Sequence, residues 1–351
     1  MIRVFSLVLS LFAAFVSQAS AQIGEARPSS NIDITVVANA PPGGPGDKLW
    51  KMFDDTVTEK SAGRLSLSLL VHGQIGGDEL VMQALRRGRG NVGIVGESGF
   101  AQVVPEVAVL NMPYLFSGPE ELDFVVDGYV TPAIKELAVQ KNLEFLQWVE
   151  IGWMNIYAKQ APKTPDDTKG YRLRSLPYET SQVFLKAIDA DVINLSFPDV
   201  IPGLQTGLID GGESSTLMYA RAGLYQEAPH FSLTRHAYSF AALLMNKEWL
   251  DSLTPADRAI MVSSFPDQAF VRKDTRDSLI VELANAEQEG VIVHRLDSMA
   301  VEPWAALARE THDDLLDQLG GEARRVYELV QEGKEVFAEE QLNKQGGLSG
   351  G

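Results

Sequence analysis

Two arginines separated by one residue are the side chains of this sequence best suited to hold an anion. Arg172 and Arg174 flank Leu173, and residues two apart on a regular strand point to the same face. A fully buried parallel strand is apolar on both faces, so this strand meets solvent or a ligand on one of them. A guanidinium grips a carboxylate through two charge-assisted hydrogen bonds, which Lys cannot reproduce. The segment therefore predicts either a carboxylate site or a pair of surface arginines.

Polar residues beside the predicted strands of the N-terminal half are further candidates for ligand contacts. Glu97 follows the apolar strand 92–95, where the ligand-facing residues of an α/β sheet are expected; a helix cap is its alternative role. Asn39 follows a strand at 32–36, and its amide both donates and accepts hydrogen bonds. Asp78 opens the next predicted helix, where it is either a ligand contact or an N-cap.

Aromatic residues near these segments supply the apolar area that walls a small-molecule pocket. Tyr and Trp add a polar group to that area. The alternative for each of them is ordinary core packing. The four candidates for the wall are Trp153, Phe197, Tyr178 and Tyr219.

Catalytic, cofactor and metal motifs fit the sequence poorly. Residues 96–100 (GESGF) lack the last glycine of a Gly-x-Ser-x-Gly nucleophile elbow. The sequence has no phosphate-binding loop, no His-Glu-x-x-His and no cysteine, so thiol chemistry and disulfides are excluded. The histidines have no metal-site spacing; they are His72, His230, His236, His294 and His312. We expect no enzyme activity, no cofactor and no metal ion.

Strands and helices alternate in two stretches of the chain, which predicts an α/β fold with two domains. The first stretch has predicted strands at 32–36, 65–69 and 92–95 and helices at 46–60 and 78–87. The second begins near Gly152, with strands at 171–175 and 192–195, a strand ending at Asp210 and a helix at 178–188. Thr254 and Pro255 begin a later helical pattern that runs to about Gly290. Pro266 is expected to kink or break it.

The N-terminus has the pattern of a cleavable secretory signal. Arg3 precedes the apolar run Val4–Val16, and Ala19-Ser20-Ala21 forms an Ala-x-Ala cleavage site. The alternative is a membrane anchor, but about thirteen apolar residues are fewer than the ~20 that a transmembrane helix needs. Cleavage after Ala21 leaves 330 of the 351 residues (351 minus 21), enough for two domains.

The mature chain is strongly acidic. Removing Arg3 with the signal leaves 29 basic and 47 acidic residues, a net charge of −18 (29 minus 47). This charge argues against nucleic acid or an anionic membrane surface as a partner. An anion site in such a protein has to be built locally, which makes an inward-facing arginine more significant.

Several short motifs occur in an order that resembles one protein family. They are 73–77 (GQIGG), 105–106 (PE), 111–116 (NMPYLF), 169–174 (KGYRLR) and 204–213 (LQTGLIDGGE). Together, between Ile32 and about Gly290, they resemble the DctP-type solute-binding subunits of tripartite ATP-independent periplasmic (TRAP) transporters. Those proteins are α/β, two-domain periplasmic binding proteins of the Venus-flytrap type, with a hinge and a long helix that spans both domains.

The resemblance implies a monomeric periplasmic protein that captures a small organic acid and delivers it to an ion-gradient-driven permease of small and large membrane subunits. The implied first domain comprises 22–151 and about 240–279, and the second comprises 152–239 and about 280–340. A disordered tail is expected at 341–351. Two other functions stay open from the residues, a secreted α/β hydrolase and a periplasmic ligand sensor without a transport role.

Within the resemblance, Arg174 falls on the family's carboxylate-binding arginine and Arg172 on a surface position. Met154 stands where many members carry a second arginine, and Ser214 where many carry asparagine. Both changes remove donors, which favours a monocarboxylate, or a zwitterion whose cation meets Glu97, over a dicarboxylate or a sugar acid held by two arginines. The expected ligand contacts are Arg174, Glu97, Asn39, Trp153, Met154, Phe197, Ser214, Asp78, Pro177 and Tyr219.

Overall fold

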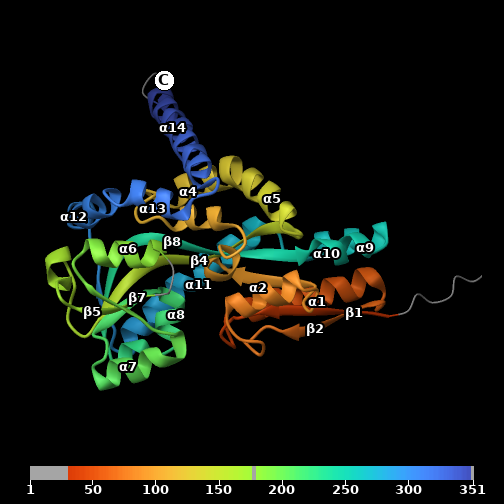
Figure 1. Cartoon of the computed structure of the whole chain (residues 1–351), viewed down its shortest axis with the longest axis horizontal. Helices are drawn as coiled ribbons and strands as arrows, with labels where there is room; N and C mark the ends of the chain where they lie inside the picture. The colour runs from red at the N-terminus through yellow and green to blue at the C-terminus, as the bar shows by residue number, and fades with distance from the viewer. Residues whose placement is uncertain (1–30, 176–178, 349–351) are drawn as a thin grey trace, which may run out of the picture.

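The computed structural model describes residues 31–175 and 179–348, and the strands of this part form one mixed sheet. The strand order is β2-β1-β3-β8-β4-β7-β5-β6, with β9 beside β8 (Figure 1). The strands are β1 (Ile32–Ala38), β2 (Leu65–Leu70), β3 (Val92–Gly96), β4 (Leu143–Ala158), β5 (Arg172–Ser175), β6 (Asp191–Asn194), β7 (Gly211–Ser215), β8 (His230–Asn246) and β9 (Ile292–His294).

Helices cover both faces of this sheet. The α-helices of the first half are α1 (Pro45–Ser61), α2 (Asp78–Arg86), α3 (Glu97–Phe100), α4 (Pro119–Val125), α5 (Thr131–Gln140) and α6 (Glu179–Ala187). Those of the second half are α7 (Val200–Thr206), α8 (Thr216–Arg221), α9 (Lys247–Ser252), α10 (Pro255–Ser264), α11 (Gln268–Gln288), α12 (Ser298–Arg309), α13 (His312–Leu319) and α14 (Ala323–Leu348). Five short 3-10 or π turns complete the described part: η1 (Pro105–Asn111), η2 (Val126–Val130), η3 (Pro165–Thr168), η4 (Phe197–Asp199) and η5 (Leu224–Gln226).

The sheet has two parallel parts joined by two long antiparallel strands. β1 pairs in parallel with β2 and β3, and β5 pairs in parallel with β6 and β7. β4 and β8 pair with each other along most of their length and run from one part to the other. Figure 1 shows the part around β1–β3, here called the first lobe, at the right and the part around β5–β7, the second lobe, at the left.

Each lobe has a core on both faces of its sheet, as a parallel sheet requires. In the first lobe, the neighbouring residues Val36 and Val37 point to opposite faces and belong to separate core clusters. In the second lobe, Ile156 and Tyr157 of β4 do the same. The predicted two-part α/β architecture is therefore confirmed.

Helix α11 spans the two lobes. Near its start, Val271 is buried in a first-lobe core, and near its end Ala286 is buried in a second-lobe core. The helix starts after Pro266, which separates it from α10, and Asp267 caps its N-terminus by accepting a hydrogen bond from the Phe270 amide. The long helix and its interruption by the proline were both predicted.

Two local predictions were wrong. The strand predicted to end at Asp210 instead begins at Gly211, because 208–210 turns out of α7 and leads into β7. The predicted disordered tail is helical as far as Leu348, the last residue of α14, and 349–351 lie outside the described residues. The signal peptide, 1–21, also lies outside them.

The C-terminal helices are divided between the two lobes, whereas the predicted domain boundary assigns all of them to the second. Trp304 and Ala308 of α12 belong to a second-lobe core, as expected for the range 280–340. Leu315 of α13 and Val326 of α14, however, are buried in a first-lobe core. The chain therefore returns to the first lobe after α12, and α14 projects from that lobe in Figure 1. Among the described residues, no helix has both the length and the apolar character needed to cross a membrane.

Candidate functional site

The candidate site lies where strands of both lobes end. Glu97 directly follows β3 of the first lobe, and Arg174 is the third residue of the four-residue β5 in the second lobe. Gly212 of β7 pairs with both Arg174 and Tyr157, so these three residues form one row across neighbouring strands. Glu213 is close enough to Glu97 for its charge to raise the pKa of that carboxyl. Groups from both lobes therefore meet.

Arg174 is held by the protein on one side only. It is 3% exposed, and its Nε donates to the carbonyl oxygen of Leu195 at 3.0 Å. The guanidinium carbon lies 5.9 Å from the centre of the Phe197 ring, within cation–π range. Its Nη2 is buried and has no hydrogen-bond partner among the described residues. Because buried donors in proteins are nearly always satisfied, this nitrogen is available to an acceptor from outside the described residues, either water or a ligand.

Glu97 is a buried acid without a donor. It is 5% exposed, and neither of its carboxylate oxygens accepts a hydrogen bond from the part of the chain described. Burial, and then the charge of Glu213, raise the pKa of Glu97 well above its usual range. A carboxyl group in this situation is stabilised by a proton, by a cation or by hydrogen-bond donors.

Glu213, in contrast to Glu97, has a polar partner at each of its carboxylate oxygens. Its Oε2 is 3.0 Å from Nε2 of His236, and its Oε1 accepts a short hydrogen bond from the hydroxyl of Ser181. The other ring nitrogen of His236, Nδ1, is 2.8 Å from Oγ1 of Thr234. The imidazole stacks on Phe184 with 4.4 Å between ring centres.

A narrow cavity lies beside this pair. It is lined by Asn111, Pro113, Met154, Thr180, Ser181, Phe184, Glu213, His236 and Ala237, and its volume of ≈ 10 Å³ holds about one water molecule. Three more buried donor groups have no partner from 31–175 or 179–348: the Thr180 hydroxyl and Asn111 Nδ2, whose residues line the cavity, and the Tyr157 hydroxyl on β4. The site thus combines several buried donors with the buried acceptor Glu97.

The structure places two other predicted residues, Met154 and Phe197, against groups of the site, and two more, Ser214 and Trp153, on strands that carry site residues. Met154 is buried and lines the cavity, and Ser214 is buried on β7, the strand next to the one that carries Arg174. Phe197 packs against the guanidinium of Arg174. Trp153 is half-buried, with its ring edge-on to Tyr238 at 4.9 Å between ring centres.

Other predicted contacts have structural roles. Asp78 is not an N-cap, since Gly77 occupies that position; its Oδ1 accepts a hydrogen bond of 3.0 Å from the amide of Gly96 and so fixes the end of β3. Asn39 is exposed and forms a β-bridge with His72. Tyr219 is a core residue rather than a pocket wall.

The hydroxyl of Tyr219 donates to the carbonyl of Ala228 at 2.8 Å, and its ring stacks on Phe231. Pro177 and Tyr178 lie outside the described residues. Arg172 is exposed and binds Asp210 through two hydrogen bonds, which confirms the surface position expected for it.

The sequence comparison with protein families shows which family the chain belongs to. The model of DctP, the bacterial extracellular solute-binding protein family 7, matches residues 36–319. The chain belongs to this solute-binding protein family. The match covers both lobes and every candidate site residue from Asn39 to Tyr219.

Relatives and solved structures agree with this assignment. The solute-binding protein is 28% identical over 267 residues to the 2,3-diketo-L-gulonate-binding periplasmic protein YiaO of Escherichia coli K12, covering 76% of this chain and 79% of that one. It is 23% identical to the ectoine-binding periplasmic protein TeaA of Halomonas elongata, covering 72% and 76%.

Its fold superposes on the sugar acid binding protein DctPAm of Advenella mimigardefordensis, solved in complex with galactonate. The TM-score is 0.80 at 23% identity, and the alignment covers 87% of this chain and 99% of the other. The chain is thus a solute-binding protein of family 7, and it has the fold of this solved structure.

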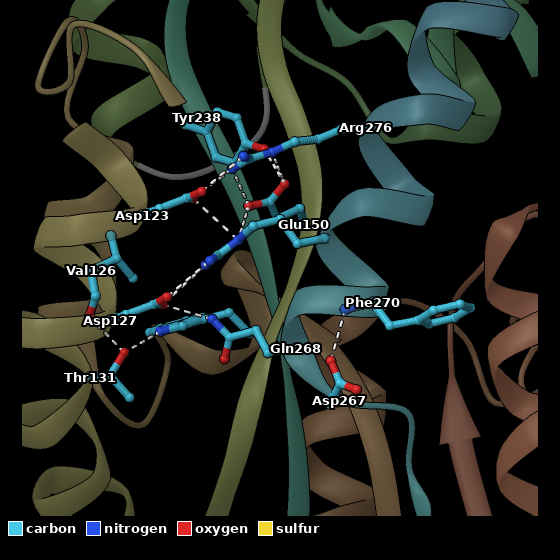
Figure 2. Close-up of polar contacts among 12 residues, drawn as sticks. Asp123, Val126, Asp127, Thr131, Glu150, Tyr238, Asp267, Gln268, Phe270 and Arg276 are labelled. Atoms are coloured by element: carbon cyan, nitrogen blue, oxygen red, sulfur yellow. Dashed lines mark hydrogen bonds and ion pairs between the residues drawn. The ribbon is translucent and has the colours of Figure 1, made fainter. Parts of the chain in front are cut away.

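A polar network anchors the spanning helix of this solute-binding protein to β4 and α4. Figure 2 shows Arg276 of α11 between Asp123 of α4 and Glu150 of β4. Glu150 is 5% exposed and accepts four hydrogen bonds: from Arg276 Nε (2.8 Å) and Nη2 (2.7 Å), from Arg272 Nε (3.0 Å) and from the hydroxyl of Tyr238 (2.6 Å). The Tyr238 ring also packs edge-on against Trp153, so the network continues into that side chain of β4.

Sequence reasoning missed four residues of the site, Glu213, His236, Ser181 and Tyr157. Glu213 belongs to a motif that was noticed, but nothing in the motif shows that its side chain points inward. His236 lies in a bulge of β8, which brings it to Glu213. The pairing of β4 with β8 shifts there, between Met154↔Ala237 and Ile156↔Ser232. A shift of this kind has no signal in a single sequence.

Proposed function

We propose that this protein captures a small organic acid between its lobes and that Arg174 binds the acid's carboxylate. The observation that carries the proposal is the buried Nη2 of Arg174, which finds no acceptor within the described residues. Tyr157 supports the same reading, because its hydroxyl is buried without a partner there and lies near enough to feel the charge of Arg174. A guanidinium edge and a hydroxyl together match the two oxygens of one carboxylate.

The donors of the site favour a single carboxylate. Met154 and Ser214 occupy the positions where a second strong donor was expected, and neither brings a positive charge. Relatives whose names give a ligand bind compounds such as 2,3-diketo-L-gulonate and ectoine, and a structural neighbour holds galactonate. A monocarboxylate or a zwitterion is consistent with these ligand types and with one arginine.

Binding requires the lobes to separate and close again. The ≈ 10 Å³ cavity beside Glu213 and His236 is too small for an organic acid. The connections between the lobes have the features of a hinge: β4 has pairing irregularities at 150/152 and 154/156, and Gly152 has φ +107°. We infer a hinge movement of two domains about β4, β8 and α11, in which the ligand completes contacts from both lobes.

We place the protein in the periplasm as a monomer that delivers its ligand to the small and large membrane subunits of an ion-gradient-driven TRAP permease. The relatives named above are periplasmic binding proteins. We expect cleavage of the signal after Ala21.

A binding role fits the buried groups better than hydrolysis. Thr234, His236 and Glu213 are bonded in the order hydroxyl, imidazole, carboxylate, as in hydrolase triads. The family model that matches this chain, however, is that of a solute-binding protein. This arrangement supports a structural role in holding Glu213, and the family match argues against the secreted hydrolase.

A ligand screen tests the proposal. Purified mature protein is screened by thermal shift against monocarboxylic, dicarboxylic, sugar and amino acids, and each hit is measured by calorimetry and incubated to look for product. We expect saturable binding of an acid, unchanged recovery of that acid, and compaction of the protein in small-angle scattering. Steady product formation, or tight binding only of compounds without a carboxylate, would overturn the proposal.

A further inference from the structure

A second cavity lies among the C-terminal helices, and it shares no lining residue with the narrow cavity beside Glu213. Its walls come from α12, α13, α14 and residues 114–115, and Figure 1 shows α13 between α12 and α14. Its volume of ≈ 260 Å³ approaches the ~300–1,000 Å³ that is typical of small-molecule pockets. The cavity is therefore large enough for a small ligand of its own.

Basic side chains outnumber acidic ones in the lining of this cavity, although the chain as a whole carries a net charge of −17. Arg309 of α12 and Lys334 of α14 are cationic near neutral pH, and His312 of α13 is a third basic group. Among the described residues, Asp313 is the one acid of the lining. A basic cavity in so acidic a protein is a local feature, and it favours an anion as the ligand.

Arg309 and Lys334 both keep hydrogens for a ligand. Arg309 bonds only through Nη2, to the exposed Glu302, and its other N–H groups have no partner among the described residues. Lys334 Nζ donates to the carbonyl oxygen of Leu115 at 2.6 Å and lies 3.8 Å from Oε1 of Glu121, which is beyond hydrogen-bond distance. An ammonium has three hydrogens, so it can donate to a ligand as well. Neither glutamate lines the cavity.

Neutral polar groups complete the lining. Nε2 of His312 donates to the carbonyl oxygen of Pro113 at 2.8 Å, and its Nδ1 has no partner in the described part of the chain. Burial lowers the pKa of His312, and the charges of the two cations lower it further, so their positive field reaches this ring. The hydroxyl of Tyr327 and the side-chain amide of Gln331 form no hydrogen bond within 31–175 and 179–348. Donor groups on α12 and α14 therefore line one cavity without protein partners.

We propose that this cavity binds a small free oxyanion, sulfate or phosphate, through Arg309 and Lys334, at a site separate from that of the solute. A tetrahedral oxyanion has acceptor oxygens on all sides, so it can accept from α12 and α14 at once. Ala308, next to Arg309, is buried in a second-lobe core, whereas Val330, one turn before Lys334, is buried in a first-lobe core. The anion thus joins helices that pack on different lobes. The inference uses no residue of the proposed solute site and is independent of the proposed function.

Calorimetry with inorganic anions tests this on the unmodified mature protein. Sodium sulfate and sodium phosphate are titrated in a buffer of low ionic strength, because salt screens exposed charges. Sodium chloride at equal ionic strength is the blank. We expect a saturable heat for at least one oxyanion and none for chloride. If neither oxyanion binds saturably, the proposal is wrong.

The variant Arg309→Gln locates the site. It removes a charged, forked donor and should weaken oxyanion binding about fivefold or more, while circular dichroism stays native because Arg309 is exposed. Arg325→Gln is the matched control: it makes the same change of charge at an exposed arginine of α14 outside the lining, and it should bind as the parent does. If Arg309→Gln binds as tightly as the parent, the anion occupies another site, such as that of Arg174, and the proposal fails.

The acid of the lining gives a test in the opposite direction. Asp313→Asn removes a negative charge from the lining and should tighten oxyanion binding about threefold. Asp313 is 88% exposed and its contact with Arg324 is 3.4 Å long, so the fold should be unaffected. Asp314→Asn is the matched control, because Asp314 is exposed on the same helix and lies outside the lining. Equal tightening in both variants would show that net charge rather than this cavity determines the affinity, and would refute the proposal.

Discussion

Replacing Arg276 by alanine should destabilise the protein by about 3 kcal/mol. Arg276 supplies two of the four hydrogen bonds that Glu150 accepts, one to each carboxylate oxygen. A hydrogen bond to a charged group contributes ~1.5 kcal/mol or more, and breaking a buried ion pair costs ~3–5 kcal/mol. We expect the lower end of that range because Arg272 and Tyr238 still donate to Glu150. The contacts of Arg276 with the partly exposed Asp123 add little, since solvent screens them.

Equilibrium urea unfolding, followed by circular dichroism, measures this loss. Lys273→Ala is a matched control in the same helix: Lys273 is 77% exposed and pairs only with Asp277 four residues on. An exposed pair of this kind contributes ~0.3–0.5 kcal/mol, so the control should remain close to the parent. If the free energy of unfolding of Arg276→Ala lies within about 0.5 kcal/mol of that of Lys273→Ala, the network in Figure 2 does not stabilise the packing of α11 on β4.

Two further predictions concern export and pH. The exported protein should begin at Gln22, because the basic start, apolar run and Ala-x-Ala site occur together; intact-mass measurement of the periplasmic protein checks this, and a mass that includes Met1 contradicts it. The pKa of Glu97 is raised in the folded state, so the native protein binds more protons than the unfolded one above the ordinary carboxyl value of 4.5. The unliganded protein should therefore lose stability as pH rises from there toward the raised pKa. Glu97→Gln should lack this contribution in thermal melts, and parallel curves for the two proteins would show that Glu97 is not buried as described.

Local patterns in the sequence were sufficient for most of the first lobe. Alternating apolar residues placed β1, β2 and β3 to within a residue or two, and the Thr-Pro-x-Asp pattern placed α10, where the side chain of Thr254 accepts from the Asp257 amide. Such signals work because capping and strand periodicity depend on neighbours in the chain. The strand that carries Arg174 was found in the same way, whereas the choice of Arg174 rather than Arg172 as the ligand contact came from the family resemblance.

The parts that sequence reasoning missed depend on contacts between distant segments. β4 and β8 were not predicted as the strands that join the lobes, since continuous apolar runs do not distinguish a strand from a buried helix. Asp78 was read as a ligand contact or a cap, although its partner is the amide of Gly96, 18 residues away. The partnership of Glu213 with His236 needs a bulge in β8. The return of α13 and α14 to the first lobe likewise follows from packing that no short pattern records.

Calorimetry of Arg174→Ala with an acid identified by the screen tests the central claim most directly. Removing one partner of a buried, hydrogen-bonded charge pair costs ~2–5 kcal/mol, or about thirty-fold to several thousand-fold in affinity at ~1.4 kcal/mol per decade. Arg174→Lys should fail in large part as well, because an ammonium cannot make the forked contact. Arg172→Ala, which removes the exposed arginine of the same strand, should bind as the parent does. We predict that only the Arg174 variants lose binding while their circular dichroism stays native; tight binding by Arg174→Ala, or loss on Arg172→Ala, would contradict the account.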